Sequence, residues 1–281
     1  MDYKARAYNL MELPFSDPLG EAYLAVEAAK KASKAVMEVY ANDFAFEKKE
    51  DDSPITKADL ESNRIIRKVL EPLGLPILSE EDADDISRLE HSRIWIVDPL
   101  DGTSDFVNRT GEFTIMIALV QDKLPIMGII ARPAMDSLFV AQQKGGAYKF
   151  EGGRWQKLAV SDISDLAKFR AVGSRFHLSE SEKEFFRRLG VSSFESRGSS
   201  LKVAEICMGM ADVYLTTSDK IKHWDTCASY CLITEAGGRM TDMKGGQILY
   251  NTKDVNHKHG LLVSNGLVHD QIIKKYSEYI L

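Results

Sequence analysis

The first half of the chain combines two patterns of apolar positions. Across residues 21–40 apolar side chains recur every three or four positions, which predicts an amphipathic helix. These side chains are Leu24, Ala25, Ala28, Ala32, Val36 and Val39. A polar segment over 47–54 separates this helix from a second predicted helix over 57–71. Short apolar runs predict strands over 75–78, 94–97, 113–121, 125–132 and 138–142, and Gly145-Gly146 and Gly152-Gly153 enclose one more.

The second half mixes helices and strands without strict alternation. Strands are predicted over 171–172, 193–195 and 211–216 and up to Val263, and helices over 179–189, 199–209, 225–236 and 267–279. This order, together with an antiparallel meander over 113–142, predicts an α+β fold built in layers. Polar residues 155–165 suggest a boundary near 160. We therefore expect an N-terminal α+β domain over 1–160, whose first 20 residues are an extension packed on the surface or frayed, and a C-terminal α/β domain over 161–281.

Composition narrows the class of protein. The chain has 281 residues, of which 44% are hydrophobic and 28% are charged, as in soluble globular proteins. We find no long apolar span and no N-terminus that resembles a signal peptide, so no membrane partner is expected. Three cysteines cannot build a disulfide framework, which predicts a cytoplasmic protein with buried thiols at Cys227 and Cys231. The net charge of −6 argues against binding polymeric nucleic acid, but it allows a small anionic substrate.

Residues 94–105 (IWIVDPLDGTSD) carry the most chemistry. The apolar run is expected to stop at Asp98, Pro99 forces a bend, and Asp101 follows three positions later. Two carboxylates at the end of a buried strand are unfavourable unless a positive charge neutralises them. A divalent cation such as Mg²⁺ prefers carboxylate and carbonyl ligands, so this segment is a candidate metal site. The alternative is an ordinary turn, because Asp-Pro and Asp-Gly are common turn dipeptides.

Four other segments have a functional and a purely structural interpretation. Thr56 and Asp59 have the spacing of a capped helix start, and Glu80 lies in an acidic loop that follows an apolar strand. Residues 198–202 (GSSLK) place hydroxyls, backbone donors and a lysine at a helix start, which suits a phosphate. Asp225 lies at another predicted helix start, where an acidic residue is also a normal N-cap.

The order of these segments resembles one superfamily across residues 20–270. The segments TKAD (56–59), SEE (79–81), DPLDGT (98–103) and WD (224–225) are similar to those of the Mg²⁺-dependent, lithium-sensitive phosphatases that include inositol monophosphatase and fructose-1,6-bisphosphatase. Residues 53–59, 78–82, 111–114, 222–228 and 253–257 resemble, within it, the 3′(2′),5′-bisphosphate nucleotidases. The resemblance implies a layered αβαβα sandwich. It also implies hydrolysis of adenosine 3′,5′-bisphosphate to AMP and phosphate, with the 3′-phosphoadenosine sulfonucleotide as a further substrate.

The resemblance also implies a metal site and a proton acceptor. Glu80, Asp98 and the Leu100 carbonyl would hold one Mg²⁺, and Asp98, Asp101 and Asp225 a second, with a third, looser ion near Glu80. Mn²⁺ is an alternative ion, and Li⁺ is the expected inhibitor. Thr103 would orient a metal-bound water, and Asp59 would accept its proton, so Asp59, Thr103 and Glu80 are the expected catalytic residues.

Substrate contacts follow from the same resemblance. Backbone amides of Gly102, Thr103 and Ser104 would receive the scissile phosphate. Ser174, His177, Gly198 and Lys202, together with Asp225, would contact the nucleotide. One departure is that related bacterial enzymes often have a basic residue shortly after the tyrosine of strand 211–216, where this chain has Thr216-Thr217; Lys220 or Lys222 would have to replace it. Alternatives are an inositol monophosphatase, an inositol 1,4-bisphosphate 1-phosphatase or a non-catalytic sensor, and the protein is expected to be a monomer or a homodimer.

Overall fold

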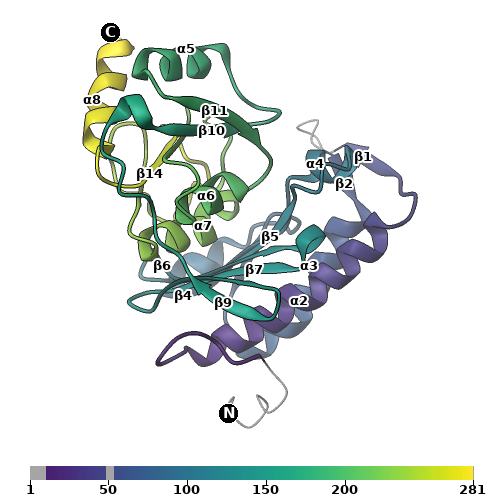
Figure 1. The fold of residues 1–281 in the computed structure, drawn as a ribbon. Coiled ribbons are helices and arrows are strands. Elements are labelled where there is room, and N and C mark those ends of the chain that lie inside the picture. Colours follow the sequence, from purple (N-terminus) through teal and green to yellow (C-terminus); the bar gives the residue numbers. More distant parts are fainter. Residues whose placement is uncertain (1–10, 49–53, 281) are drawn as a thin grey trace.

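Helices and sheets alternate in five layers in the computed structural model, which describes residues 11–48 and 54–280 (Figure 1). The order of the layers is α2 and α3, a seven-stranded sheet, α6 and α7, a five-stranded sheet, and finally α5 and α8. This arrangement confirms the predicted α+β class and the αβαβα sandwich. Residues 1–10 of the expected extension and residues 49–53 of the predicted polar segment lie outside the described residues.

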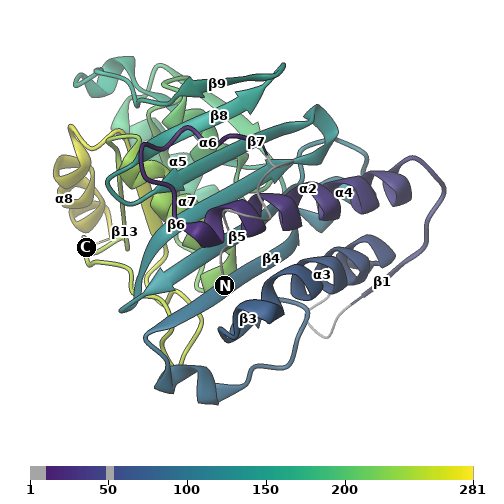
Figure 2. The same ribbon diagram turned by 90° about the horizontal axis from the view of Figure 1, so that it is seen from below.

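The first helical layer consists of α2 (Gly20–Tyr40) and α3 (Lys57–Leu70), which lie side by side across the seven-stranded sheet (Figure 2). Five alanines of α2 are buried, and their small side chains let the helix lie close to the sheet. Both helices match the predicted ranges to within one residue. A two-stranded hairpin, β1 (Phe46–Lys48) and β2 (Pro54–Thr56), leads into α3.

The seven-stranded sheet follows the chain order from β3 to β9. Its strands are β3 (Ile77–Ser79), β4 (Arg93–Asp101), β5 (Thr114–Gln121), β6 (Leu124–Arg132), β7 (Ser137–Gln142), β8 (Gly146–Glu151) and β9 (Arg154–Lys157). β3 pairs with β4 in parallel and every later pair is antiparallel, which confirms the predicted meander. Residues of both faces are buried because a helical layer covers each face.

The structure corrects three local expectations in this half of the chain. Strand β4 does not stop at Asp98: pairing with β5 shifts register between Asp98 and Asp101 and then resumes, because the buried Leu100 side chain keeps this part of the chain inside the fold. Trp155 belongs to β9 rather than to a polar connector. Residues 11–19 do not merely cover the surface, since Leu13 and Phe15 are buried in the core between α2 and the sheet.

The middle layer holds α6 (Leu201–Cys207) and α7 (His223–Glu235) between the two sheets. α7 lies so close to β6 that a Cβ atom on Gly128 would be 2.4 Å from the Ala228 carbonyl oxygen. The three cysteines are free and buried, as expected for thiols in a core. α7 therefore has a fixed position relative to the seven-stranded sheet.

The five-stranded sheet has the order β11-β10-β12-β14-β13 and combines parallel and antiparallel pairs. Its strands are β10 (Arg170–Ser174), β11 (Ser193–Arg197), β12 (Val213–Thr216), β13 (Arg239–Thr241) and β14 (Leu261–Ser264). The outer helices α5 (Glu180–Leu189) and α8 (His269–Tyr279) cover its far face. Sequence patterns predicted all of these except β13, which has only three residues.

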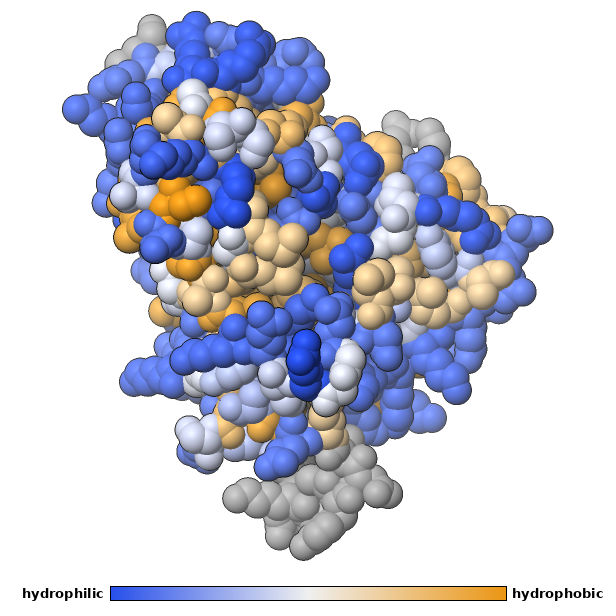
Figure 3. All heavy atoms as spheres, in the orientation of Figure 1, coloured by the Kyte–Doolittle hydropathy of each residue, from blue (hydrophilic) through white to orange (hydrophobic). Residues whose placement is uncertain are grey.

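Most of the face in the orientation of Figure 1 is hydrophilic, and apolar residues gather toward its centre (Figure 3). Among residues 11–48 and 54–280, none of the helices combines the length and apolar character that a membrane crossing requires. The remaining regular elements are α4 (Thr103–Val107) and short 3₁₀ helices over Glu71–Leu73, Ile86–Glu90, Pro133–Met135 and Leu166–Lys168.

The close approach of α7 to β6 generates a stability prediction. Gly128→Val should lower the free energy of unfolding by about 3 kcal/mol, the upper end of the usual effect of overpacking, because its Cβ would overlap the backbone at Ala228. Urea denaturation followed by circular dichroism measures this. Gly152→Asn is the control: no atom lies within 4 Å of a Cβ there, and asparagine tolerates the φ of 58°. Equal effects of the two substitutions would contradict the packing argument.

Candidate active site

A hydrogen-bonded chain connects α3, α4 and the end of β4. The N-cap of α3 is Thr56, and Asp59 Oδ2 accepts hydrogen bonds from the Thr56 backbone N–H and hydroxyl, both at 2.7 Å. Asp59 Oδ1 lies 3.0 Å from Thr103 Oγ1, which is also 3.1 Å from the Leu100 carbonyl oxygen. The structural interpretation of Asp59 as a capping residue is thus correct. Its second carboxylate oxygen, Oδ1, nevertheless accepts a hydrogen bond from the hydroxyl of Thr103, the other residue of the proposed proton transfer.

Three carboxylates meet beside this chain. Glu80, Asp98 and Asp225 each offer an oxygen atom, and these atoms lie within 4.8 Å of one another. Glu80 directly follows β3, Asp98 lies in β4 and Asp225 lies in the first turn of α7. The parallel pairing of β3 with β4 brings the ends of the two strands together. Residues separated by 145 positions of sequence therefore share one site.

The electrostatics of this group are those of crowded, buried acids. Burial and the neighbouring charges of Glu80, Asp101 and Asp225 raise the pKa of Asp98 well above its usual value. Burial and the charge of Glu80 raise the pKa of Asp225 to about 8, although the carboxylate accepts a 2.7 Å hydrogen bond from the Lys222 backbone N–H. A cation between these carboxylates would remove the repulsion, as expected for a metal site.

Asp101 lies near this group but makes different contacts. Its Oδ2 accepts hydrogen bonds from the Ser200 backbone N–H at 2.5 Å and from Thr114 Oγ1 at 3.1 Å. Its charge contributes to the raised pKa of Asp98, so the two carboxylates are close neighbours. The structure thus joins three of the four predicted acidic ligands in one group and places the fourth between that group and the start of α6.

The proposed phosphate-binding turn lies at the start of α4. Gly102 has a φ of 87°, and a Cβ atom there would be 3.1 Å from Ser199 Cβ. Thr103 and Ser104 form the first turn of α4, where backbone N–H groups have no carbonyl partner within the helix. The turn therefore presents backbone N–H donors and lies next to the segment 198–202.

Lys202 is buried and surrounded by polar partners. Its ammonium donates a hydrogen bond to the Ser199 carbonyl oxygen and lies 5.3 Å from the centre of the Tyr214 ring. Burial lowers the pKa of Lys202, and the nearby carboxylates of Asp101, Asp105 and Asp225 oppose that shift. The lysine is therefore directed into the acidic site rather than into solvent.

Two other predicted contacts are more exposed. His177 lies in a turn after β10, and its backbone N–H donates to Ser174 Oγ at 3.1 Å. Burial lowers the pKa of His177, and the charges of Lys202 and Asp105 also act on it, so this pair of residues lies at the edge of the site. Of the two replacement cations, Lys222 places its ammonium 5.2 Å from the centre of the Trp224 ring, and the charge of Lys220 contributes to the lowered pKa of His177.

Two residues of the site gave no individual signal in the sequence. Ser199 has a φ of 46°, and its buried hydroxyl has no hydrogen-bond partner among the described residues. Helix α6 begins at Leu201, two residues later than predicted, because Ser199 adopts this left-handed conformation. Glu112 accepts a hydrogen bond from the Gly198 backbone N–H at 2.7 Å. A serine or glutamate in a loop is too common for these roles to be recognised from sequence alone.

The donor set fits a hard divalent cation. Its ligand atoms are carboxylate oxygens of Glu80, Asp98 and Asp225, and no thiol belongs to the group among the described residues. The Leu100 carbonyl oxygen contacts Thr103 Oγ1 beside it. Burial and the charges of neighbouring acids raise the pKa values of Asp98 and Asp225, and a cation in the group would counter both effects. The described residues thus have both the chemistry and the electrostatic need for a metal ion.

Comparison with known proteins agrees with this geometry. A curated relative from Salmonella typhimurium, named 3′(2′),5′-bisphosphate nucleotidase CysQ, is 34% identical over 233 residues, or 81% of this chain and 93% of the relative. The relative of the same name from Escherichia coli K12 is 34% identical over 243 residues, or 85% and 97% of the two chains. These relatives confirm the resemblance to that group of enzymes.

Solved structures show the same fold. CysQ from Bacteroides thetaiotaomicron, described as a bacterial member of the inositol monophosphatase family, has a TM-score of 0.75 and 32% identity, and the alignment covers 87% of this chain and 96% of that one. An IMPase from Thermotoga maritima has a TM-score of 0.79 and 25% identity over 93% and 98% of the two chains. The model of the inositol monophosphatase family matches residues 21–281. This chain therefore belongs to the inositol monophosphatase family.

Proposed function

We propose that the protein is a metal-dependent 3′(2′),5′-bisphosphate nucleotidase that hydrolyses the 3′-phosphate of adenosine 3′,5′-bisphosphate to give AMP and phosphate. The observation that carries this proposal is the group of carboxylates from Glu80, Asp98 and Asp225 beside the Asp59–Thr103 hydrogen bond. The names of the CysQ relatives support the choice of a nucleotide substrate. The 3′-phosphoadenosine sulfonucleotide is a second proposed substrate, because it carries the same 3′-phosphate.

Mg²⁺ is the proposed ion, with Mn²⁺ as an alternative and Li⁺ as an inhibitor. Glu80, Asp98 and the Leu100 carbonyl would hold one ion, and Asp98, Asp101 and Asp225 a second. A third, looser ion would lie near Glu80. When bound, such ions stabilise the charge that develops on the phosphoryl oxygens and favour ionisation of water at neutral pH.

The chain's own residues would orient the phosphate and move the proton. Backbone N–H groups of Gly102, Thr103 and Ser104 would donate to the phosphate oxygens. Thr103 Oγ1 would take a proton from the attacking water while it gives its own proton to Asp59 Oδ1, which lies 3.0 Å away. Burial raises the pKa of Asp59, which makes this carboxylate a better proton acceptor.

The nucleotide would lie across the segment from Gly198 to Lys202. The buried hydroxyl of Ser199, which has no hydrogen-bond partner in the described chain, supports a contact with the sugar or base. Lys202 and His177 would contact the sugar or the retained 5′-phosphate, and Ser174 would lie beside them.

The proposal also includes a domain boundary near residue 160, since the strands of the two sheets lie on either side of it in the sequence.

An inositol monophosphatase, or an inositol 1,4-bisphosphate 1-phosphatase, is the alternative enzyme. Structural neighbours with IMPase in their names support it. A non-catalytic sensor is less well supported, because the acidic ligands and Thr103 are all present.

The three free cysteines support a reducing compartment such as the cytoplasm. For the oligomeric state we propose a monomer or a homodimer.

A substrate panel separates these proposals. With Mg²⁺, adenosine 3′,5′-bisphosphate should have a kcat/KM at least about tenfold above those of inositol 1-phosphate, inositol 1,4-bisphosphate and fructose 1,6-bisphosphate, because Ser199 and Lys202 can contact the nucleoside. Phosphate release measures each rate. Preference for inositol 1-phosphate would reject the nucleotidase proposal, and release from none would favour the sensor.

A substitution at the centre of the acidic group tests the role of the metal. Asp98→Asn should lower kcat by at least about a thousandfold, since it removes a carboxylate that would help to hold both ions. The metal-free variant should unfold at the same or a higher temperature than the metal-free wild type, because it has one fewer repelling carboxylate.

Thermal unfolding with and without Mg²⁺ provides the second measurement. Mg²⁺ should raise the unfolding temperature of the wild type and leave that of Asp98→Asn unchanged. Asp122→Asn, in the exposed turn between β5 and β6, is the matched control and should behave as wild type. Full activity of Asp98→Asn would exclude the proposed metal arrangement.

A further inference from the structure

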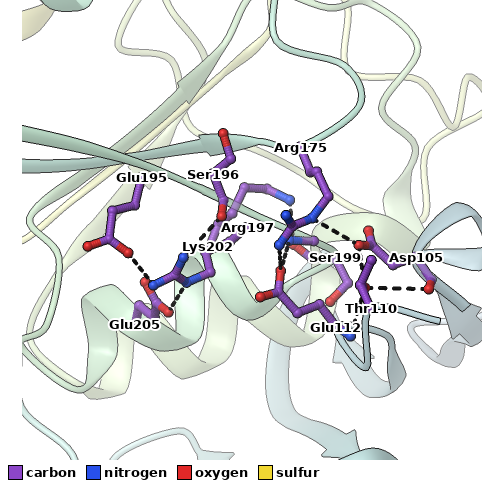
Figure 4. Close-up of polar contacts among 11 residues, drawn as sticks. Asp105, Thr110, Glu112, Arg175, Glu195, Ser196, Arg197, Ser199, Lys202 and Glu205 are labelled. Carbon is purple, nitrogen blue, oxygen red and sulfur yellow. Dashed lines mark hydrogen bonds and ion pairs between the residues drawn. The ribbon is translucent and has the colours of Figure 1, made fainter. Parts of the chain in front are cut away.

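Glu112 joins parts of the chain that are far apart in sequence. It lies in the loop between α4 and β5, and its Oε2 accepts hydrogen bonds from Arg175 Nη2 at 2.5 Å and from the Gly198 backbone N–H at 2.7 Å (Figure 4). Arg175 directly follows β10 of the other sheet, and its Nε lies 3.2 Å from Asp105 Oδ1. One carboxylate thus connects the loop before β5 to two segments of the second half.

A second carboxylate, that of Asp101, holds the same segment at Ser200, two residues after Gly198. Asp101 Oδ2 accepts a 2.5 Å hydrogen bond from the Ser200 backbone N–H, and Thr114 Oγ1 lies 2.8 Å from Ser200 Oγ. Gly198 and Ser200 are therefore both fixed to the first half of the chain, and Ser199 lies between them. We call Glu112, Arg175 and Asp101, with the two backbone N–H groups that they hold, the clasp.

The clasp fixes a conformation that the segment would not choose alone. Ser199 has a φ of 46°, which is unfavourable for a residue with a side chain. Gly198 has no space for a side chain, since a Cβ atom would lie 2.4 Å from Asp105 Oδ2 and 2.6 Å from the Glu112 carbonyl oxygen. The surroundings thus hold the Ser199 hydroxyl in one place next to Gly102, with no hydrogen-bond partner in the part of the chain that the structure describes.

We infer that Glu112, oriented by Arg175, is a positioning residue that sets the place of Ser199 and Lys202 relative to the phosphate-binding turn of α4. This inference rests on the proposed function and adds a determinant of substrate specificity to it. Neither side chain of the pair needs to touch the reacting atoms. The pair instead sets the distance between two parts of the substrate site. One part is the turn at the start of α4, which would bind the scissile phosphate, and the other is Ser199 and Lys202, which would bind the remainder of the substrate.

The positioning role has a kinetic signature that a stabilising role lacks. A partly exposed ion pair contributes little to stability, and the side chains of Arg175 and Glu112 are 33% and 16% exposed. Displacement of the segment weakens binding of the nucleoside but leaves the acidic group and Thr103 in place. KM for a nucleotide should therefore rise while kcat stays constant, and a substrate without sugar or base should be unaffected.

The test compares Glu112→Gln and Arg175→Met with a matched control. Both variants should raise KM for adenosine 3′,5′-bisphosphate about tenfold, as expected for loss of one charge-assisted hydrogen bond, and change kcat less than twofold. Their kcat/KM for p-nitrophenyl phosphate should equal that of the wild type. Arg175→Lys, which keeps the charge, should restore part of the affinity.

Glu205→Gln is the control for loss of an ion pair. It removes the Arg197–Glu205 contact of 2.5 Å, whose side chains are 27% and 15% exposed, on α6 but outside the clasp (Figure 4). This control should keep the KM for adenosine 3′,5′-bisphosphate and for p-nitrophenyl phosphate, and Glu112→Gln and Glu205→Gln should both unfold within about 2 °C of the wild type. Arg175→Met should unfold at a lower temperature than these two, because it also removes the ion-pair partner of Asp105, whose side chain is 4% exposed.

Two results would overturn the inference: an equal loss of kcat on both substrates in the Glu112 and Arg175 variants, or an unchanged KM. A wild-type enzyme that prefers inositol 1-phosphate would reject the proposed nucleotide substrate instead. The same KM comparison would then be made with inositol 1-phosphate against p-nitrophenyl phosphate, and it would support or reject the clasp independently.

Discussion

Oxygen atoms of Glu80, Asp98 and Asp225 lie within 4.8 Å of one another where β3, β4 and α7 meet, and the repulsion among these acids is the constraint that the surrounding structure must satisfy. Asp98 is only 1% exposed, so water cannot screen its charge. Hydrogen bonds from the backbone at Leu100 and Lys222 relieve part of the strain. A bound divalent cation would relieve the rest, which links the folding of this region to its chemistry.

Rigid packing keeps these groups in register although they come from different layers. The close contact of Gly128 with Ala228 fixes α7, and therefore Asp225, against the sheet that carries Asp98. The register shift after Asp98 leads the chain to Thr103, whose hydroxyl contacts both Asp59 and the Leu100 carbonyl oxygen. At the other side of the site, Asp101 and Glu112 hold the segment that begins α6. The site is thus assembled from short polar segments at the ends of well-packed elements.

Sequence patterns predicted the layers because most elements are long enough to show their period. α2 shows the spacing of a buried helix face over 21 residues, and β5 and β6 are continuous apolar runs. The short β13 and the strand character of Trp155 carried no such signal, because three or four residues do not define a period. Asp98 was expected to end its strand, since sequence alone does not reveal a bulge that allows pairing to resume.

The candidate site was predicted unevenly for similar reasons. Glu80, Asp98 and Asp225 were identified through the order of their segments, which resembles one superfamily, and the structure brings them together. The hydrogen bonds of Glu112 span 63 and 86 residues of sequence, and the place of the Ser199 hydroxyl, which has no hydrogen-bond partner among the described residues, depends on the local φ. Neither feature leaves a mark in the sequence.

Proton release on cation binding tests the central claim most directly. Burial and the charges of neighbouring acids raise the pKa of both Asp98 and Asp225 without a cation, so this group of carboxylates is expected to hold a proton at pH 7 and to lose it when Mg²⁺ binds. Isothermal titration of the metal-free protein with Mg²⁺ at pH 7, in two buffers of different ionisation enthalpy, measures the number of protons released. The account predicts clear release from the wild type and reduced release from Asp225→Asn. Binding without proton release, or no binding at millimolar Mg²⁺, would contradict it.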